Sequence, residues 1–337
     1  MTALGSRPKP CGAPARQFGV SLIELMVAMT IGLIMIAGAV TVFTKTRDVY
    51  SSMETTARMQ ETARYAMSVI ESDVRMANFW GLISQPDLFT NDSTSSAPLD
   101  PTVTNNCGAN STYVTNVKAY LTGTNNAYAL TCGAYGAGSV AGSDVLVARR
   151  SSATRIAQTA AGLTPYKDVL MIESSRTAAE IFKGDASGTI PSNYAQADVS
   201  GQPPQADTRQ LIVNAYYVSQ DSSVAAGYPS LRRKALIKGP AIQDEEIAPG
   251  VEDFQVQLGV DVNGDRNADV FVNPNSVPAG GTVVAARIWL RIRAQDRDVA
   301  WKDTQSYVYA DRNDGAPNDQ FRRIVVVKTI QIRNTRA

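Results

Sequence analysis

The chain has 337 residues, with 32 basic and 31 acidic side chains. This balance gives no basic stripe that would indicate a nucleic acid as a direct partner. The sequence contains no histidine, which excludes a Ser-His-Asp or Cys-His catalytic centre and removes the commonest metal ligand. It also contains no nucleophile motif, phosphate-binding loop or dinucleotide fingerprint. We therefore expect a protein that is not an enzyme and requires no cofactor.

The beginning of the chain combines a basic stretch with a long apolar one. Residues 1–18 contain three basic side chains and no acid, and such a flank stays on the cytoplasmic side of a membrane. The run from Val20 to Phe43 has no proline, and as a helix it would span about 36 Å, enough for a bilayer core. Glu24 is its one ionisable residue, and a charge in a membrane segment usually has a partner.

Three ordinary explanations cover part of this pattern. A secretory signal peptide would be cut near Ala37-Gly38-Ala39, but its apolar core needs only about 7–15 residues and avoids acids. A plain membrane anchor explains the length of the run but gives no reason for Glu24. A carboxylate near the helix end that reaches the lipid headgroups is a third explanation.

The segment SLIELMVAMTIG, which begins at Ser21, resembles the start of type IV prepilins and pseudopilins. In that family a membrane peptidase cuts after a glycine that ends a basic leader, and the fifth residue of the mature chain is glutamate. Gly19, Val20 and Glu24 stand at the matching positions. The resemblance implies a leader over residues 1–19, prepilin peptidase as a partner, and N-methylation of Val20, although the family usually has Phe there.

The resemblance also implies a role for the acid. In the family, this glutamate pairs with the N-terminal amine of a neighbouring subunit in the filament. Here Glu24 would pair with the amine of Val20 of a neighbour, and the opposite charge would offset the cost of burial. The implied localisation is a single pass through the inner membrane over residues 20–43, with the head in the periplasm and later in a pilus on the cell surface.

The helix is expected to continue through residues 44–77, which contain no proline or glycine. Apolar and small residues recur there at three- and four-residue steps, which predicts one buried helix face. The predicted buried positions are Met53, Ala57, Gln60, Ala63, Met67, Ile70 and Val74, and the predicted polar positions are Glu54, Arg58, Glu61, Arg64, Glu71, Asp73 and Arg75.

The helix exit and the chain end resemble PilW-type minor pilins. The exit segment DVRMANFWG begins at Asp73 and includes Phe79 and Trp80, which we expect in the core. The closing segment DRNDGAPNDQFRR begins at Asp311. The resemblance implies a minor pilin in the initiation or tip complex of a type IV pilus, with other minor pilins and the major pilin as partners. The alternatives are a J-like minor pseudopilin of a type II secretion system or, less favoured, a membrane-anchored periplasmic enzyme.

Residues 78–337 are expected to form a β-rich head, which makes the fold class α+β. Short β-branched and aromatic runs bounded by turn residues predict its strands. The predicted strands are 144–149, 168–173, 210–218, 231–238, 251–259, 282–294 and 320–334. The strand at 282–294 alternates apolar residues with Arg287, Trp289, Arg291 and Arg293, which indicates a solvated basic face or a contact with an acidic neighbour.

Residues 84–143 are rich in Ser, Thr, Asn and Gly and are expected to form a loop-rich insertion. Cys107 and Cys132 both follow the membrane segment, so they would lie in the oxidising periplasm. We predict a disulfide between them that contributes about 3 kcal/mol by chain entropy. Two unrelated thiols are the alternative.

The segment DVNGDRNAD places oxygen side chains at alternate positions, as calcium loops do. These residues are Asp261, Asn263, Asp265, Asn267 and Asp269. Arg266 stands where such loops need glycine, and no glutamate closes the twelfth position. Related pseudopilins bind calcium in loops of their heads. A simple turn between two strands remains the other interpretation.

Overall fold

The computed structural model describes residues 19–108, 112–191 and 206–335. The chain forms two units, Met1–Glu54 and Thr55–Ala337, and each is described by itself. The predicted leader, apart from Gly19, lies outside the described residues.

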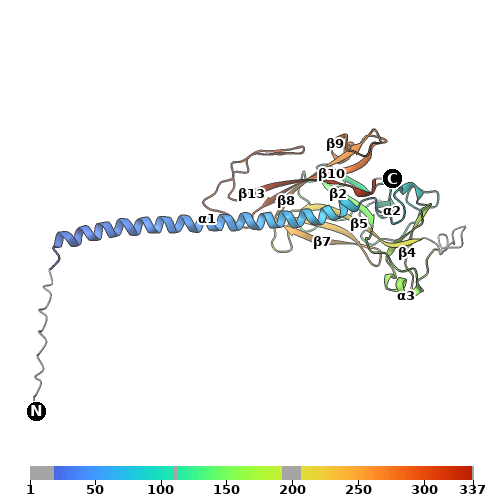
Figure 1. The fold of residues 1–337 in the computed structure, drawn as a ribbon, viewed down its shortest axis with the longest axis horizontal. Helices are drawn as coiled ribbons and strands as arrows, with labels where there is room; N and C mark the ends of the chain where they lie inside the picture. The colour runs from blue at the N-terminus through green and yellow to red at the C-terminus, as the bar shows by residue number, and fades with distance from the viewer. Residues whose placement is uncertain (1–18, 109–111, 192–205, 336–337) are drawn as a thin grey trace, which may run out of the picture. The chain divides into compact units, whose positions relative to one another are not determined.

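One long helix, α1 (Leu22–Met76), begins the described chain (Figure 1). Up to Glu54 its side chains are exposed with few exceptions, whereas seven residues beyond that point are buried. The buried residues are Met59, Ala63, Ala66, Met67, Ile70, Asp73 and Val74. The predicted face is therefore correct from Ala63 onward, but Met53, Ala57 and Gln60 are exposed, and Asp73, predicted on the polar face, is buried.

The rest of the chain is β-rich, which confirms the predicted α+β class. Within the described part of the chain the strands form sheets of seven, four and two strands. The seven-stranded sheet contains β1 (Leu121–Thr124), β2 (Val145–Ser151), β3 (Leu170–Ser174), β4 (Ala179–Lys183), β5 (Asp207–Ser219), β6 (Ser230–Ile237) and β7 (Ala241–Pro249). The other sheets contain β8 (Val251–Asp261), β9 (Val270–Val272), β10 (Thr282–Arg293) and β13 (Arg323–Gln331), and β11 (Tyr307–Tyr309) with β12 (Arg312–Asp314).

Short helices connect some of these strands. They are η1 (Pro86–Leu88), α2 (Thr112–Thr115), α3 (Ala160–Leu163), η2 (Thr164–Tyr166), η3 (Pro274–Ser276) and η4 (Arg333–Thr335). All seven predicted strands are present, with ends that differ by three residues at most.

Both larger sheets are antiparallel and share one core with α1. The strand order is β1-β2-β5-β3-β4, with β6 and β7 continuing from β5, and β13-β10-β8-β9 in the second sheet. The buried α1 residues join one apolar cluster with residues of both sheets, for example Tyr216 of β5 and Ile288 of β10. Since each sheet has one face to bury, the amphipathic part of α1 supplies the third surface of this core.

The alternation predicted along β10 is confirmed, but its basic face is not simply solvated. Ala286, Ile288, Leu290 and Ile292 are at most 1% exposed. On the other face, Arg291 forms ion pairs with Glu252 (3.2 Å) and Asp314 (2.6 Å) and is 8% exposed. Arg287 lies over the ring of Phe271, and Arg293 lies over Phe321. These three arginines therefore form ion pairs and ring contacts within the head.

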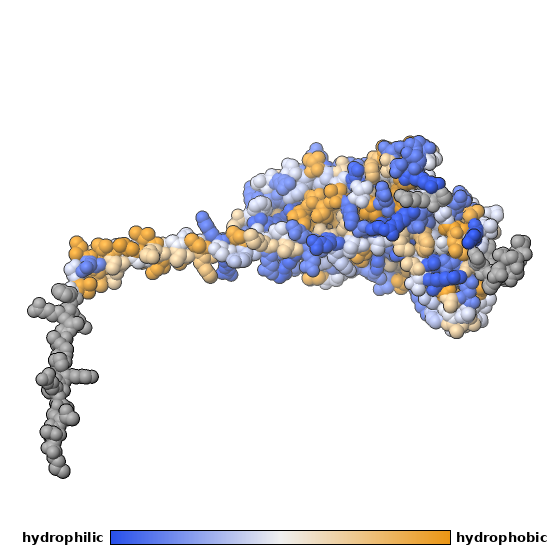
Figure 2. Space-filling model, viewed as in Figure 1, coloured by the Kyte–Doolittle hydropathy of each residue, from blue (hydrophilic) through white to orange (hydrophobic). Residues whose placement is uncertain are grey.

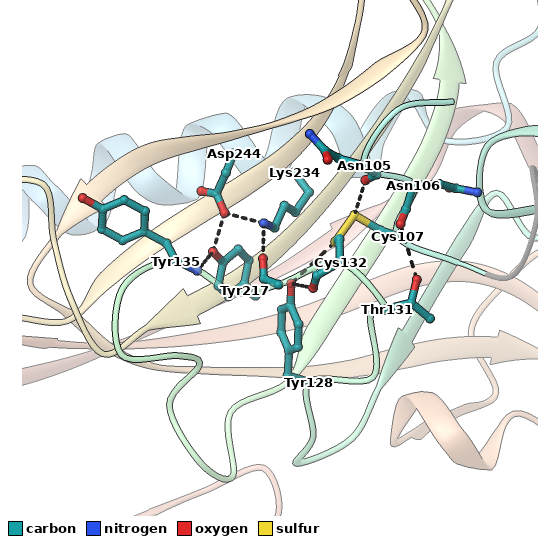
Figure 3. Close-up of a disulfide and its surroundings, with 11 residues drawn as sticks. Asn105, Asn106, Cys107, Tyr128, Thr131, Cys132, Tyr135, Tyr217, Lys234 and Asp244 are labelled. Atoms are coloured by element: carbon teal, nitrogen blue, oxygen red, sulfur yellow. Dashed lines mark hydrogen bonds and ion pairs between the residues drawn. A yellow bond between two sulfur atoms is a disulfide. The ribbon is translucent and has the colours of Figure 1, made fainter. Parts of the chain in front are cut away.

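The predicted disulfide between Cys107 and Cys132 is present, with the Cα atoms 4.5 Å apart (Figure 3). The hydroxyl of Tyr128 donates to the carbonyl of Cys132 (2.8 Å). Just beyond, Lys234 of β6 donates to the carbonyl of Gly133 (2.6 Å), so this end of the disulfide loop is held to the seven-stranded sheet. The disulfide thereby connects the irregular segment around Cys107, which precedes α2, to the seven-stranded sheet.

Two buried carboxylates face each other in the seven-stranded sheet. Glu173 of β3 lies directly opposite Glu180 of β4, and the two are 0% and 7% exposed. Burial, and then the charge of Glu180, raises the pKa of Glu173 to about 7. The amide of Gln158 donates to Glu173 (3.4 Å), but it carries no charge that would offset the second carboxylate.

This pair predicts a pH-dependent stability. The folded state binds the proton of Glu173 more tightly than the unfolded chain, whose pKa is about 4.3. The contribution of Glu173 to stability is therefore greatest below about pH 4 and falls as the pH rises from about 4 to about 7. In Glu173→Gln, the fall in the free energy of unfolding over this pH range should be smaller by up to about 3 kcal/mol, since one pKa unit is worth about 1.4 kcal/mol. Unfolding midpoints of both proteins in detergent at pH 5 and pH 8 test this, and an equal pH dependence in both would contradict it.

Candidate functional site

The first turn of α1 places Ser21 and Glu24 in a reciprocal capping arrangement. The amide of Glu24 donates to the Ser21 hydroxyl (3.2 Å), while the Ser21 amide and hydroxyl donate to Glu24 Oε2 (3.3 and 3.4 Å). This is the Ser-x-x-Glu capping box, which satisfies amides that have no partner within the helix. Glu24 is thus held by its own chain, close to the exposed Gly19 and Val20.

The segment that follows, up to Phe43, contains no charged residue, and Figure 2 shows apolar side chains along the visible face of this start of α1. Val20, Ile23, Ile34 and Phe43 are each at least 70% exposed. Among the described residues, α1 is the one helix that is long and apolar enough to cross a membrane. A helix that is hydrophobic all round needs a lipid or a protein environment, so this segment is built to be covered.

At the other end of α1, Asp73 joins the helix to the head. Arg150 of β2 donates to Asp73 Oδ1 from two nitrogens (2.9 and 2.8 Å). Asn214 and Tyr216 of β5 both donate to Oδ2 at 2.6 Å. Burial and the charge of Asp73 raise the pKa of Tyr216, which keeps its hydroxyl a donor. One helical carboxylate is thus bonded to two neighbouring strands.

The helix exit is fixed by Asn78, which adopts a left-handed conformation with φ of 62°. Asparagine tolerates this conformation and often ends helices. Its side-chain amide donates to the carbonyls of Ser84 (3.1 Å) and Asn334 (3.2 Å), and its oxygen accepts from the Trp80 indole (2.8 Å). Trp80 is fully buried, as predicted, whereas Phe79 is only partly buried and lies under Arg209. The end of the described chain therefore closes over the end of α1.

The acidic segment after β8 forms a tight turn. Asp261 accepts from the amides of Asn263 (3.1 Å), Gly264 (2.7 Å) and Arg266 (2.7 Å). Asp269 accepts from the side chain of Asn263 (2.9 Å) and the amide of Val262 (2.9 Å).

Two further oxygens of this segment cap amides of the turn. Asn263 accepts from the amide of Asp265, and Asp265 accepts from the amide of Asn267. The described residues contain no group of three or more His, Cys, Asp or Glu side chains arranged to hold a metal. Calcium binding by Asp261, Asn263, Asp265 and Asp269 stays a prediction.

Two comparisons with known families match parts of the chain. Residues 14–40 match the prokaryotic N-terminal methylation motif. Residues 215–334, from β5 to η4, match the type IV pilus-assembly protein W. No curated protein and no solved structure matches the chain.

Together, the methylation motif, the exposed apolar helix and the β-rich head are consistent with a type IV pilin. The match over the second half of the head supports a PilW-like protein, that is, a minor type IV pilin involved in pilus assembly. The apolar helix and the methylation motif fit a pilin anchored in the inner membrane.

Sequence reasoning identified Gly19, Val20 and Glu24 as one group, and they lie together at the start of α1. It did not identify Ser21 as the partner of Glu24, although the Ser-x-x-Glu spacing was visible. It also did not identify Asp73, because its partners Arg150 and Asn214 are far away in the sequence.

The Asp73 network predicts a large difference between two acids that lie close together on α1. Asp73→Asn leaves Arg150 without its charge partner at a site where both side chains are largely buried (3% and 13% exposed), and should cost about 3 kcal/mol or more. Glu71→Gln breaks ion pairs with Arg75 and Lys328 that are more exposed, and should cost less than about 1 kcal/mol. Unfolding midpoints of the detergent-solubilised variants test this, and equal losses would contradict the assignment.

Proposed function

We propose that this protein is made as an inner-membrane prepilin, is cut by prepilin peptidase between Gly19 and Val20, and is N-methylated on Val20. Its head then lies in the periplasm. The mature chain joins other minor pilins and the major pilin, in the complex that initiates the pilus and forms its tip. It acts by assembly and not by catalysis. The methylation motif over residues 14–40, which includes most of the exposed apolar segment of α1, carries this proposal.

Glu24 has the central role in the assembly step. Its capping bonds to Ser21 are long, at 3.3 and 3.4 Å, and they satisfy the carboxylate without neutralising its charge. A carboxylate near a membrane core costs about 2.5–3.5 kcal/mol at the helix centre and less towards the end. Docking beside the free Val20 amine of a neighbouring subunit would supply the missing opposite charge. This exchange of partners favours assembly over the isolated membrane helix.

The alternative assembly is a type II secretion pseudopilus with a J-like subunit. Both assemblies would use the same processed N-terminus. The match of residues 215–334 to the type IV pilus-assembly protein W favours the pilus. A membrane-anchored enzyme finds no support in the sequence, which has no histidine and no catalytic motif.

Replacing Glu24 tests the assembly role. In cells that lack the wild-type gene, the Glu24→Ala protein should still insert into the membrane and lose its leader. Its amount in sheared pili should fall at least tenfold. Asp48→Ala is the matched control, because Asp48 is an exposed acid on the same helix outside the apolar segment, and it should leave incorporation unchanged. Immunoblots of membrane and pilus fractions give both quantities. Glu24→Ala protein in pili at the unchanged level would contradict the proposal.

A further inference from the structure

Strand β13 has one edge that no described strand covers. It ends the order β13-β10-β8-β9, so it pairs with β10 alone. It contains the run Ile324-Val325-Val326-Val327, and Val327 is 58% exposed. Natural sheets usually protect long apolar edges of this kind, because such edges offer free hydrogen-bonding groups to another chain.

The hydrogen-bond register shows which backbone groups are free. The amide of Ala294 donates to the carbonyl of Arg322, and the amide of Ile332 donates to the carbonyl of Val284. Bonded pairs alternate along an antiparallel ladder, so the even-numbered residues of β13 face β10. The N–H and C=O groups of Val325, Val327, Thr329 and Gln331 therefore point away from the sheet.

A groove runs beside this edge, between β13 and the part of α1 within the head. One cavity of about 350 Å³ is lined by Ala63, Met67 and Val326, among others. A second, of about 610 Å³, continues towards the end of β13, and Glu71 lines both. The ion pair of Glu71 with Lys328 (2.6 Å) joins helix and strand between them. The groove thus follows the free edge of β13. The part of it beside Ala63, Met67 and Val326 is apolar.

The groove carries an excess of positive charge. Its basic side chains are Arg64, Arg75, Lys328 and Arg333, and its one acid is Glu71. Glu71 already pairs with Arg75 and Lys328. Arg64 and Arg333 have no acidic partner among the residues that the structure describes. An occupant with acidic side chains would complement both ends of the groove.

We propose that the free edge of β13 binds an extended acidic segment of another pilus subunit, which adds to the sheet as a fifth strand. The outward backbone groups supply the hydrogen bonds of strand addition, and the groove beside α1 receives alternate side chains. A second β13 fits poorly, because the strand has two basic residues, Arg323 and Lys328, and no acid. That the occupant is a pilus subunit rests on the proposed function, whereas the strand-binding edge does not.

A capped nine-residue peptide of alternating Glu and Val tests the edge directly. Fluorescence anisotropy would follow its binding to the full mature chain in detergent. Val327→Pro removes one outward N–H and none that bonds β10, so the fold should persist while peptide binding weakens at least tenfold. Arg64→Glu with Arg333→Glu should weaken binding similarly without touching the backbone. The control Arg176→Glu changes an exposed cation in the turn between β3 and β4 of the other sheet, outside both cavities of the groove, and should leave binding unchanged.

Two results would overturn the strand-binding edge. One is equal binding by Val327→Pro and by the unchanged protein, with unfolding midpoints that show both are folded. The other is equal binding of a peptide in which Lys replaces every Glu.

Expression of Val327→Pro in cells tests whether the occupant of the edge is a pilus subunit. Val327→Pro chains that lose the leader normally but fail to enter pili support a pilus subunit, whereas normal entry despite lost peptide binding would exclude one. A chain that keeps its leader would contradict the proposed function alone.

Discussion

A single buried carboxylate, Asp73, holds the architecture of the head together. It lies on α1 and accepts hydrogen bonds from Arg150 of β2 and from Asn214 and Tyr216 of β5. Apolar packing alone would allow α1 to slide or rotate over the sheets, because it is not directional. A charged acceptor with fixed donors on two strands permits one register, since every other position leaves a buried charge unpaired. The closure at Asn78 and the groove beside β13 both depend on this position of the helix.

Local signals in the sequence were enough for the helix and for the long strands. The period of three to four residues over 44–77, and the alternation along β10, each report a face that must be buried. Strand β7 escaped prediction because its sequence AIQDEEIAP has little β-propensity. Its acids pair instead with the basic residues directly opposite on β6, as Glu245 does with Arg233. Strand β4 escaped because Glu180 breaks its apolar pattern. These elements depend on contacts between distant segments, which no single window contains.

The candidate site divides in the same way. The resemblance of the chain start to prepilins identified Gly19, Val20 and Glu24, and the methylation-motif match covers them. The capping bond of Ser21 is equally local. The groove beside β13 could not be predicted, because α1 and β13 come from opposite ends of the chain and meet only in the folded head. One chain thus combines a local assembly signal at its start with a head whose surface features arise from its fold.

The central claim, that this chain is a processed PilW-like pilin, is tested most directly at its N-terminus. Mass spectrometry of the membrane-extracted protein, from cells with and without prepilin peptidase, would identify the first residue. The account predicts a chain that begins at N-methylated Val20, and an uncut chain when the peptidase is absent. An intact leader in both strains, or cleavage after Ala39, would mean that the apolar helix is an anchor or an export signal, and the assembly role of Glu24 would be wrong.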